Sequence, residues 1–133
     1  MDDEHRVAIV SDADIVVARQ HGRALAQQLG FSSTDATLIA TAISEVARNI
    51  VAYAGHGDIE ISAQRQARRR GVRVVARDSG PGIAQVEQAM QDGFSTSGSL
   101  GLGLPGARRL MDEFDIASEV GRGTTITMIK WAT

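Results

Sequence analysis

Residues 32–55 read SSTDATLIATAISEVARNIVAYAG, and this stretch decides the fold. It opens with a cluster of helix-capping residues, Ser32 to Asp35, and it closes at Gly55, a residue type that commonly ends helices. Between them, apolar side chains recur at helical spacing: Ala36, Ile39, Ala40, Ile43, Val46, Ala47 and Ile50. The stretch therefore predicts an amphipathic helix with one buried side.

Two polar residues of this helix share a second face. At about 100° per residue, Glu45 and Asn49 lie within about 40° of each other and roughly 120–160° from the apolar stripe. Such a face suits a helix that packs on a sheet behind and covers a ligand in front. A solvated polar face has the same spacing, so this helix alone leaves both interpretations open.

The residues before this helix predict a strand and another helix. Val7 to Val10 are β-branched or small and apolar, which favours a short strand. Ser11 and Asp14 have the spacing of a capping box, and an apolar stripe of helical period then runs to Gly30. We therefore expect a first amphipathic helix between the strand and residue 30.

The residues after the 32–55 helix predict a β-hairpin. Apolar and polar residues alternate from Ile59 to Ala63 and again from Val72 to Ala76. A basic turn at residues 65–71 separates the two runs. A short helical stretch is expected over 84–91. A loop is expected over 93–100, because these residues are rich in Gly, Ser and Thr.

The C-terminal third predicts a helix and two strands. Pro105 begins a helix with five apolar residues on one side: Leu104, Ala107, Leu110, Met111 and Phe114. Strands over 116–120 and 124–131 flank the turn Gly121-Arg122-Gly123. Because the order lacks regular βαβ alternation, we expect a two-layer α+β fold, with helices on one face of a mixed, largely antiparallel sheet.

Composition narrows the function classes. The 133 residues fit one globular domain over 1–133, and the net charge of -2 gives no general attraction to nucleic acid or anionic lipid. The absence of cysteine excludes disulfides, thiolate metal sites and a cysteine nucleophile. The N-terminus MDDEHRVAIV is unlike a signal peptide or a membrane span. We therefore expect a cytoplasmic protein with no membrane or nucleic-acid partner.

Asp78 ends a predicted strand and points to its core side by period-two alternation. A carboxylate there needs a hydrogen-bond donor, and a purine amine, a serine, a backbone N–H or a strand-end turn would each serve. Gly80 and Gly82 flank Pro81 and permit close approach of the backbone to a flat ring, although DSGPG is also an ordinary turn sequence.

Gly101, Gly103 and Gly106 surround the start of the predicted third helix, where free N–H groups and the helix dipole favour phosphate oxygens. The run GLGLPG lacks the GK[ST] ending of a P-loop. Although it matches the GxGxxG spacing of dinucleotide-binding folds, it follows a loop and not a strand. The run Gly123-Thr124-Thr125 is, taken alone, a hairpin turn followed by β-prone threonines.

Four segments in sequence order resemble the N, G1, G2 and G3 boxes of GHKL ATPases and kinases: EVARN at 45–49, DSGPG at 78–82, GLGLPG at 101–106 and Gly123-Thr124. The resemblance covers essentially the whole chain. The runs AISEVARNIVAYAG, QDGFSTSG, GLPGARRLMDEFDI and the terminal IKW are similar to the RsbT-type switch kinases of bacterial stress-response modules. The resemblance implies the Bergerat fold of histidine-kinase-like ATPases.

The resemblance also implies ATP and Mg²⁺ between helices and sheet. Glu45 matches the family's proposed general base, Asn49 its magnesium ligand, and Asp78 its adenine-reading carboxylate. The loop Phe94 to Leu100 resembles the ATP lid. The ATP-binding residues implied are Asn49, Asp78, Gly80, Gly82, Ser95, Thr96, Ser97, Gly98, Gly101, Leu102, Gly103, Leu104 and Thr124.

Switch kinases of this type phosphorylate serine or threonine on STAS-domain scaffold and antagonist proteins, and when released they activate a PP2C-type phosphatase. The resemblance implies these partners for the chain. Two alternatives remain open: an anti-sigma factor kinase that binds a sigma factor, and a non-catalytic module that uses ATP only to fix its shape. The basic run Arg68-Arg69-Arg70 would dock an acidic partner or form a solvated turn.

Overall fold

The computed structural model describes residues 4–80 and 103–132, and the expected helix at 84–91 and loop at 93–100 lie outside them. The described chain forms three helices and five strands. In chain order these are β1 (Glu4–Ile9), α1 (Asp12–Gln28), α2 (Ser33–Tyr53), β2 (Gly57–Gln66), β3 (Arg69–Asp78), α4 (Gly103–Leu110), β4 (Glu113–Glu119) and β5 (Gly123–Trp131).

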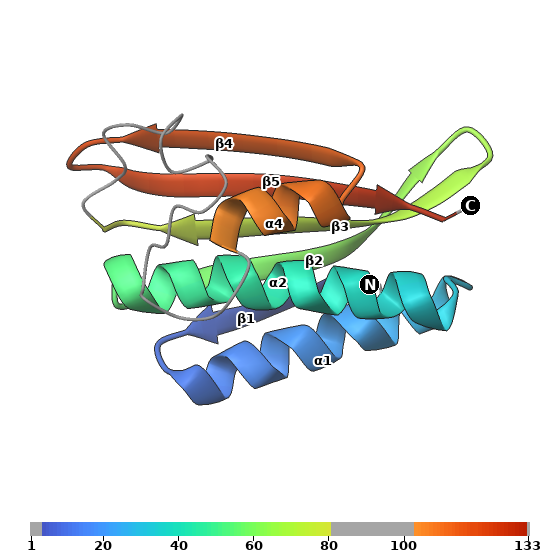
Figure 1. Cartoon of the computed structure of the whole chain (residues 1–133), viewed down its shortest axis with the longest axis horizontal. Helices are drawn as coiled ribbons and strands as arrows, with labels where there is room; N and C mark the ends of the chain where they lie inside the picture. Colours follow the sequence, from blue (N-terminus) through green and yellow to red (C-terminus); the bar gives the residue numbers. More distant parts are fainter. Residues whose placement is uncertain (1–3, 81–102, 133) are drawn as a thin grey trace.

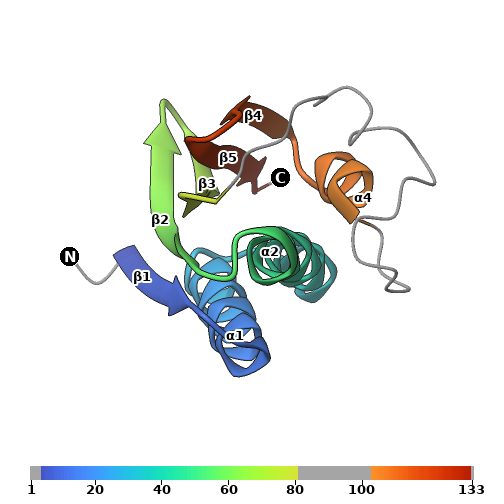
Figure 2. The same cartoon turned by 90° about the vertical axis from the view of Figure 1, so that its left-hand side faces the viewer.

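The five strands form one sheet in the order β1-β2-β3-β5-β4 (Figure 1). Each neighbouring pair is antiparallel, so the expectation of a mixed sheet is wrong for the described residues. All three described helices lie on the same face of this sheet (Figure 2). The predicted two-layer α+β architecture is confirmed.

The core lies between the helices and the sheet. Alternate residues of β3, namely Val72, Val74 and Ala76, are buried on the helix side, and Ala76 pairs with Ile59 of β2 and Ile126 of β5. Residues on the other side of the strand alternate with them, because successive side chains of a strand point to opposite faces. The helix-facing side of the sheet is therefore apolar and consists largely of β-branched side chains.

Helix α2 is the central helix of the layer. Its residues 42–47 are all buried, because α1 packs against one side, the sheet against another and α4 against a third (Figure 2). Gly22 of α1 lies at the contact with α2, where an added Cβ would collide with Cδ1 of Ile43. Capping agrees with the sequence: Ser32 Oγ accepts a hydrogen bond from Asp35 N at 3.1 Å.

The boundaries of the third predicted helix differ from the expectation. Helix α4 begins at Gly103, two residues before Pro105, and ends at Leu110, so the assignment of Met111 and Phe114 to the helix is wrong. Phe114 belongs to β4, where it pairs with Met128. Between α4 and β4, the Asp112 carboxylate accepts a hydrogen bond from the backbone N–H of Trp131 in β5 at 2.7 Å.

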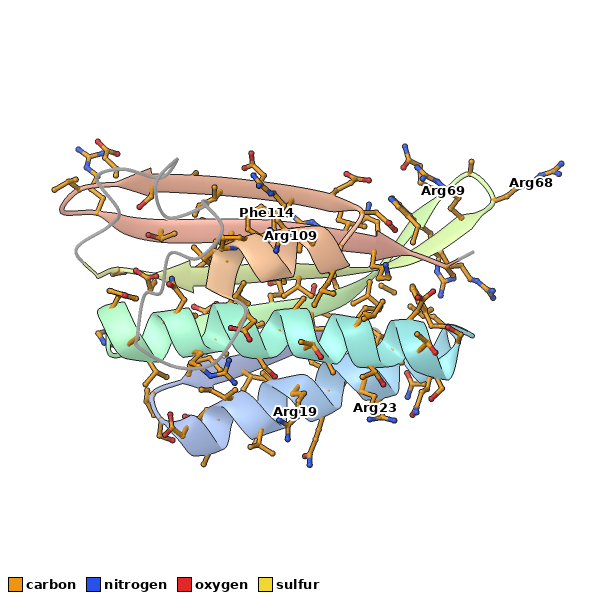
Figure 3. The ribbon with its side chains drawn as sticks, in the orientation of Figure 1. Arg19, Arg23, Arg68, Arg69, Arg109 and Phe114 are labelled. Atoms are coloured by element: carbon orange, nitrogen blue, oxygen red, sulfur yellow. The ribbon has the colours of Figure 1, made fainter. Side chains whose placement is uncertain are left out.

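The hairpin of β2 and β3 is confirmed, with a shorter turn than expected. Only Ala67 and Arg68 lie between the strands, and Ala67 adopts a positive φ of 53°. The hairpin continues past both neighbouring strands, and Arg68 and Arg69 lie at its tip (Figure 3). The Arg69 guanidinium lies 4.1 Å from the Trp131 ring centre. Both Arg68 and Arg69 are exposed, and Arg69 also contacts the face of the Trp131 ring.

No helix in the described ranges 4–80 and 103–132 is long and apolar enough to cross a bilayer.

Candidate functional site

A polar row crosses the helix side of the sheet at one end. Asp78 pairs with Gly57 of β2 and with Thr124 of β5, and Thr124 pairs in turn with Ser118 of β4. Directly paired residues in adjacent strands point to the same face. The next row inward is apolar, so the helix-facing side of the sheet ends in a carboxylate and two hydroxyls.

The Asp78 carboxylate lies at the edge of the core and is half-buried. Its Oδ1 accepts a hydrogen bond from the backbone N–H of Gly80 at 2.9 Å, which is the strand-end turn considered from the sequence. Gly57 packs closely beside it, because an added Cβ would collide with the carbonyl oxygen of Arg77 and would lie 3.2 Å from the Cβ of Asp78. Asp78 therefore has a local donor and a neighbour without a side chain.

Gly80 approaches the C-terminal end of α2. An added Cβ there would lie 2.6 Å from the Cβ of Ala54, a distance that packed side chains do not adopt. Gly57 contacts the same helix, since its added Cβ would lie 3.0 Å from Ile50 Cγ2. The polar row therefore lies under the last turns of α2, next to the turn that carries Asn49.

Thr124 is buried next to Asp78, with 5% of its surface exposed. Its Oγ1 lies 2.8 Å from Ser118 Oγ, which also donates to the carbonyl oxygen of Gly123 at 3.2 Å. Gly123 adopts a φ of +103° and comes close to Asp78, where an added Cβ would collide with the Asp78 carbonyl oxygen. The Gly123-Thr124 segment is therefore more than a hairpin turn, because it packs on the end of β3.

Glu45 and Asn49 lie on the side of α2 that faces α4, and they are 8% and 7% exposed. The solvated-face interpretation of these residues is therefore wrong. Glu45 Oε1 accepts a hydrogen bond from the backbone N–H of Gly103 at 3.1 Å, and Oε2 lies 3.0 Å from Arg48 Nη1. The carboxylate thus reaches the first residue of α4, across 58 residues of sequence.

Asn49 Oδ1 is buried and has no hydrogen-bond partner among the described residues. An unpaired buried oxygen of this kind costs about 1–3 kcal/mol. A bound cation would satisfy it, because amide oxygens belong to the ligand class that Mg²⁺ accepts. Asn49 therefore fits the magnesium ligand that the sequence resemblance implies.

Of the expected ATP-binding residues, the structure brings Asn49, Asp78, Gly80 and Thr124 to the region beneath and beside the C-terminal half of α2. Gly103 begins α4 with a φ of +70°. Leu104 is buried in the hydrophobic core. The other expected positions lie outside the described residues: Gly82, Ser95, Thr96, Ser97, Gly98, Gly101 and Leu102.

Three residues at this site were not among the predictions from sequence. Gly57 and Ser118 owe their place to strand register, which cannot be read from a single strand. Arg48 stands three residues after Glu45, and this spacing of opposite charges on a helix would have identified the pair.

Known proteins resemble this chain in sequence. Residues 10–130 match the family of histidine kinase-like ATPase domains. The chain is 52% identical to the serine/threonine-protein kinase RsbT of Bacillus subtilis over 131 residues, which is 98% of each chain. It is 33% identical to an anti-sigma F factor of Anoxybacillus flavithermus, over 87% of this chain and 83% of that protein.

Two solved structures share the fold. The mycobacterial sensor histidine kinase MprB superimposes with a TM-score of 0.57 at 14% identity, over 97% of both chains. The catalytic domain of the histidine kinase ThkA gives a TM-score of 0.53 at 17% identity, over 95% of both chains.

The chain belongs to the histidine kinase-like ATPase family, of the GHKL type. The identity to RsbT over nearly the whole length also confirms the enzyme class predicted from the sequence, a protein serine/threonine kinase.

Proposed function

We propose that the chain is an ATP- and Mg²⁺-dependent kinase that acts as a partner-switching regulator. Its substrates are serine or threonine residues of STAS-domain proteins of the stressosome, and its released form binds and activates a PP2C-type phosphatase. The 52% identity to RsbT supports this proposal. The observation that carries it is the burial of Glu45 and Asn49, together with the hydrogen bond from the first residue of α4 to Glu45.

In this proposal Glu45 is the general base. Its carboxylate takes the proton of the substrate hydroxyl as the hydroxyl oxygen forms its bond to the γ-phosphorus of ATP. The bond from that phosphorus to the bridging oxygen breaks, and ADP leaves with the electron pair. Magnesium bound through Asn49 would offset negative charge on the phosphates.

The remaining residues bind the nucleotide in this proposal. Asp78 accepts a hydrogen bond from the exocyclic amine of adenine, next to the hydroxyl of Thr124. Gly80 and Gly82 let the backbone approach the ring, and the glycines at 101–103 flank the phosphates. Residues 95–98 belong to the lid that excludes water during transfer.

The test is a phosphorylation assay with γ-labelled ATP, Mg²⁺ and purified STAS-domain proteins encoded beside the kinase. We expect label on a serine or threonine of the STAS protein, and none when EDTA replaces Mg²⁺. Glu45→Gln is the matched variant, since it keeps the shape of the side chain and removes its basic oxygen. Equal labelling by this variant would contradict the assigned base.

An anti-sigma factor kinase is the second candidate, because the chain is 33% identical to an anti-sigma F factor. Direct binding to a purified sigma factor in the presence of ATP, together with failure to bind a PP2C-type phosphatase, would favour it. A third candidate is a module that binds ATP without transferring phosphate. A Glu45→Gln protein that still binds ATP, transfers no phosphate and still switches its partners would favour that candidate.

A further inference from the structure

Contacts at both oxygens hold the Glu45 carboxylate. Gly103 N donates to Oε1 at 3.1 Å, and Arg48 Nη1 lies 3.0 Å from Oε2. A carboxylate held at one oxygen can rotate about its last side-chain bond, whereas contacts at both oxygens fix its plane. The Gly103 contact comes from the backbone of another helix, so Arg48 is the side chain through which α2 itself orients the carboxylate.

Arg48 and Asn49 flank Glu45 on opposite sides around the axis of α2. At about 100° per residue, position i+3 lies about 60° to one side of position i, and position i+4 lies about 40° to the other side. Around the helix axis, position 45 therefore lies between Arg48, whose guanidinium contacts its carboxylate, and Asn49, whose amide oxygen is buried. Arg48 and a metal ion bound at Asn49 would therefore act on opposite sides of Glu45.

Burial distinguishes this ion pair from the Arg6–Glu60 pair. The Glu45 side chain is 8% exposed and that of Arg48 is 37% exposed. Arg6 and Glu60 form a pair with the same 3.0 Å separation between β1 and β2, but their side chains are 62% and 17% exposed. Exposed pairs contribute little, because water screens them and ordering long side chains costs entropy. The Arg48 contact is less screened at its carboxylate end.

We infer that Arg48 is a positioning residue for phosphoryl transfer: its guanidinium holds the Glu45 carboxylate in the orientation from which that carboxylate accepts the hydroxyl proton. This inference rests on the proposed function. Arginine suits the role because its planar group presents donors in a fixed geometry, whereas the lysine ammonium is a rotating point charge. Arg48 acts through Glu45, and its loss lowers the transfer rate without changing how tightly ATP binds.

The test compares four variants with the wild-type chain: Arg48→Met, Arg48→Lys, Glu45→Gln and Arg6→Met. Arg6→Met is the matched control, because it removes an arginine–glutamate pair of equal length away from α2. We expect Arg48→Met to lower kcat for transfer to the STAS protein by about 10-fold or more and to leave the Kd for ATP within about twofold. Arg48→Lys recovers part of the rate, and Arg6→Met equals wild type.

A double variant shows whether Arg48 acts through Glu45. In the Glu45→Gln background, adding Arg48→Met lowers the residual rate by less than about twofold, because the carboxylate to be oriented is already gone. A full additional 10-fold loss would overturn the inference. A rate for Arg48→Met equal to that of Arg6→Met, or an ATP Kd weakened more than about 10-fold, would also overturn it.

The amide resonance of Gly103 gives a readout that does not need activity. In a ¹H–¹⁵N correlation spectrum, Glu45→Gln and Arg48→Met both shift this resonance, while Arg6→Met does not. If the wild-type chain transfers no phosphate to any STAS protein, the proposed function fails, and the Gly103 resonance still decides whether Arg48 orients Glu45. An unmoved resonance in Arg48→Met overturns the inference in either case.

Discussion

Replacing Asn49 by leucine should make the nucleotide-free protein more stable and abolish its Mg²⁺-dependent binding of ATP. Asn49 Oδ1 is buried without a hydrogen-bond partner among the described residues, and such an oxygen costs about 1–3 kcal/mol. Leucine has a similar branched shape and no polar atom. We expect the free energy of unfolding to rise by about 1–2 kcal/mol, which for 133 residues raises Tm by about 4–7 °C.

Thr124→Val is the matched control. Thr124 is as buried as Asn49, but its hydroxyl pairs with Ser118 at 2.8 Å. Its replacement by an apolar isostere therefore removes a satisfied hydrogen bond, and we expect the free energy of unfolding to fall by about 1 kcal/mol. The two variants make the same kind of change at two buried polar groups and should move stability in opposite directions.

The assay is thermal unfolding followed by circular dichroism in EDTA without nucleotide, together with calorimetric titration of Mg-ATP. Wild type should gain Tm when Mg-ATP is added, since a ligand that binds only the folded state stabilises it, and Asn49→Leu should not. A Tm for Asn49→Leu below that of wild type in EDTA would refute the reasoning. Normal Mg-ATP affinity in that variant would refute Asn49 as the metal ligand.

Three further outcomes are expected. Glu45→Ala should lower phosphotransfer by at least about 100-fold while the calorimetric Kd for ATP stays within about twofold, and a rate near wild type would exclude Glu45 as the base. Asp78→Asn should weaken ATP binding by about 10-fold or more in the same titration, and an unchanged Kd would remove Asp78 from the adenine site. Lys130→Met should lower Tm by about 4 °C, because Lys130 Nζ donates a hydrogen bond to the carbonyl oxygen of Leu110, the last residue of α4, at 3.0 Å. A Tm equal to that of wild type would show that this hydrogen bond does not stabilise the fold.

Elements with a long apolar stripe could be predicted from the sequence because their pattern is local. The stripe from Ala36 to Ile50 and the cap at Ser32 define α2 without any reference to the rest of the chain. The end of α4 could not be predicted, because Phe114 continues the helical spacing. Two residues past the end of the helix, the Asp112 carboxylate accepts the backbone N–H of Trp131, 19 residues away. A local period cannot report a contact of that range.

The candidate site divides in the same way. The face of Asp78 follows from period-two alternation, and its pairing with Thr124 agrees with that direction. Helix α4 packs on α2, and Gly103 of α4 contacts Glu45, so the spacing of Glu45 and Asn49 on one helix could not distinguish a site from a solvated face. Ser118 and Gly57 could be assigned to the site only from the strand register in the structure, which places them on either side of Asp78 and Thr124.

The enclosure of α2 has a consequence for how this protein can change in evolution. Residues 42–47 are buried in an unbroken run, whereas the buried positions of α1 recur once per turn. A scan of all single substitutions should therefore show a periodic pattern of tolerated positions along α1 and a continuous intolerant block in α2. Substitutions that adapt the protein to new partners are therefore expected on other elements, while residues 42–47 change slowly.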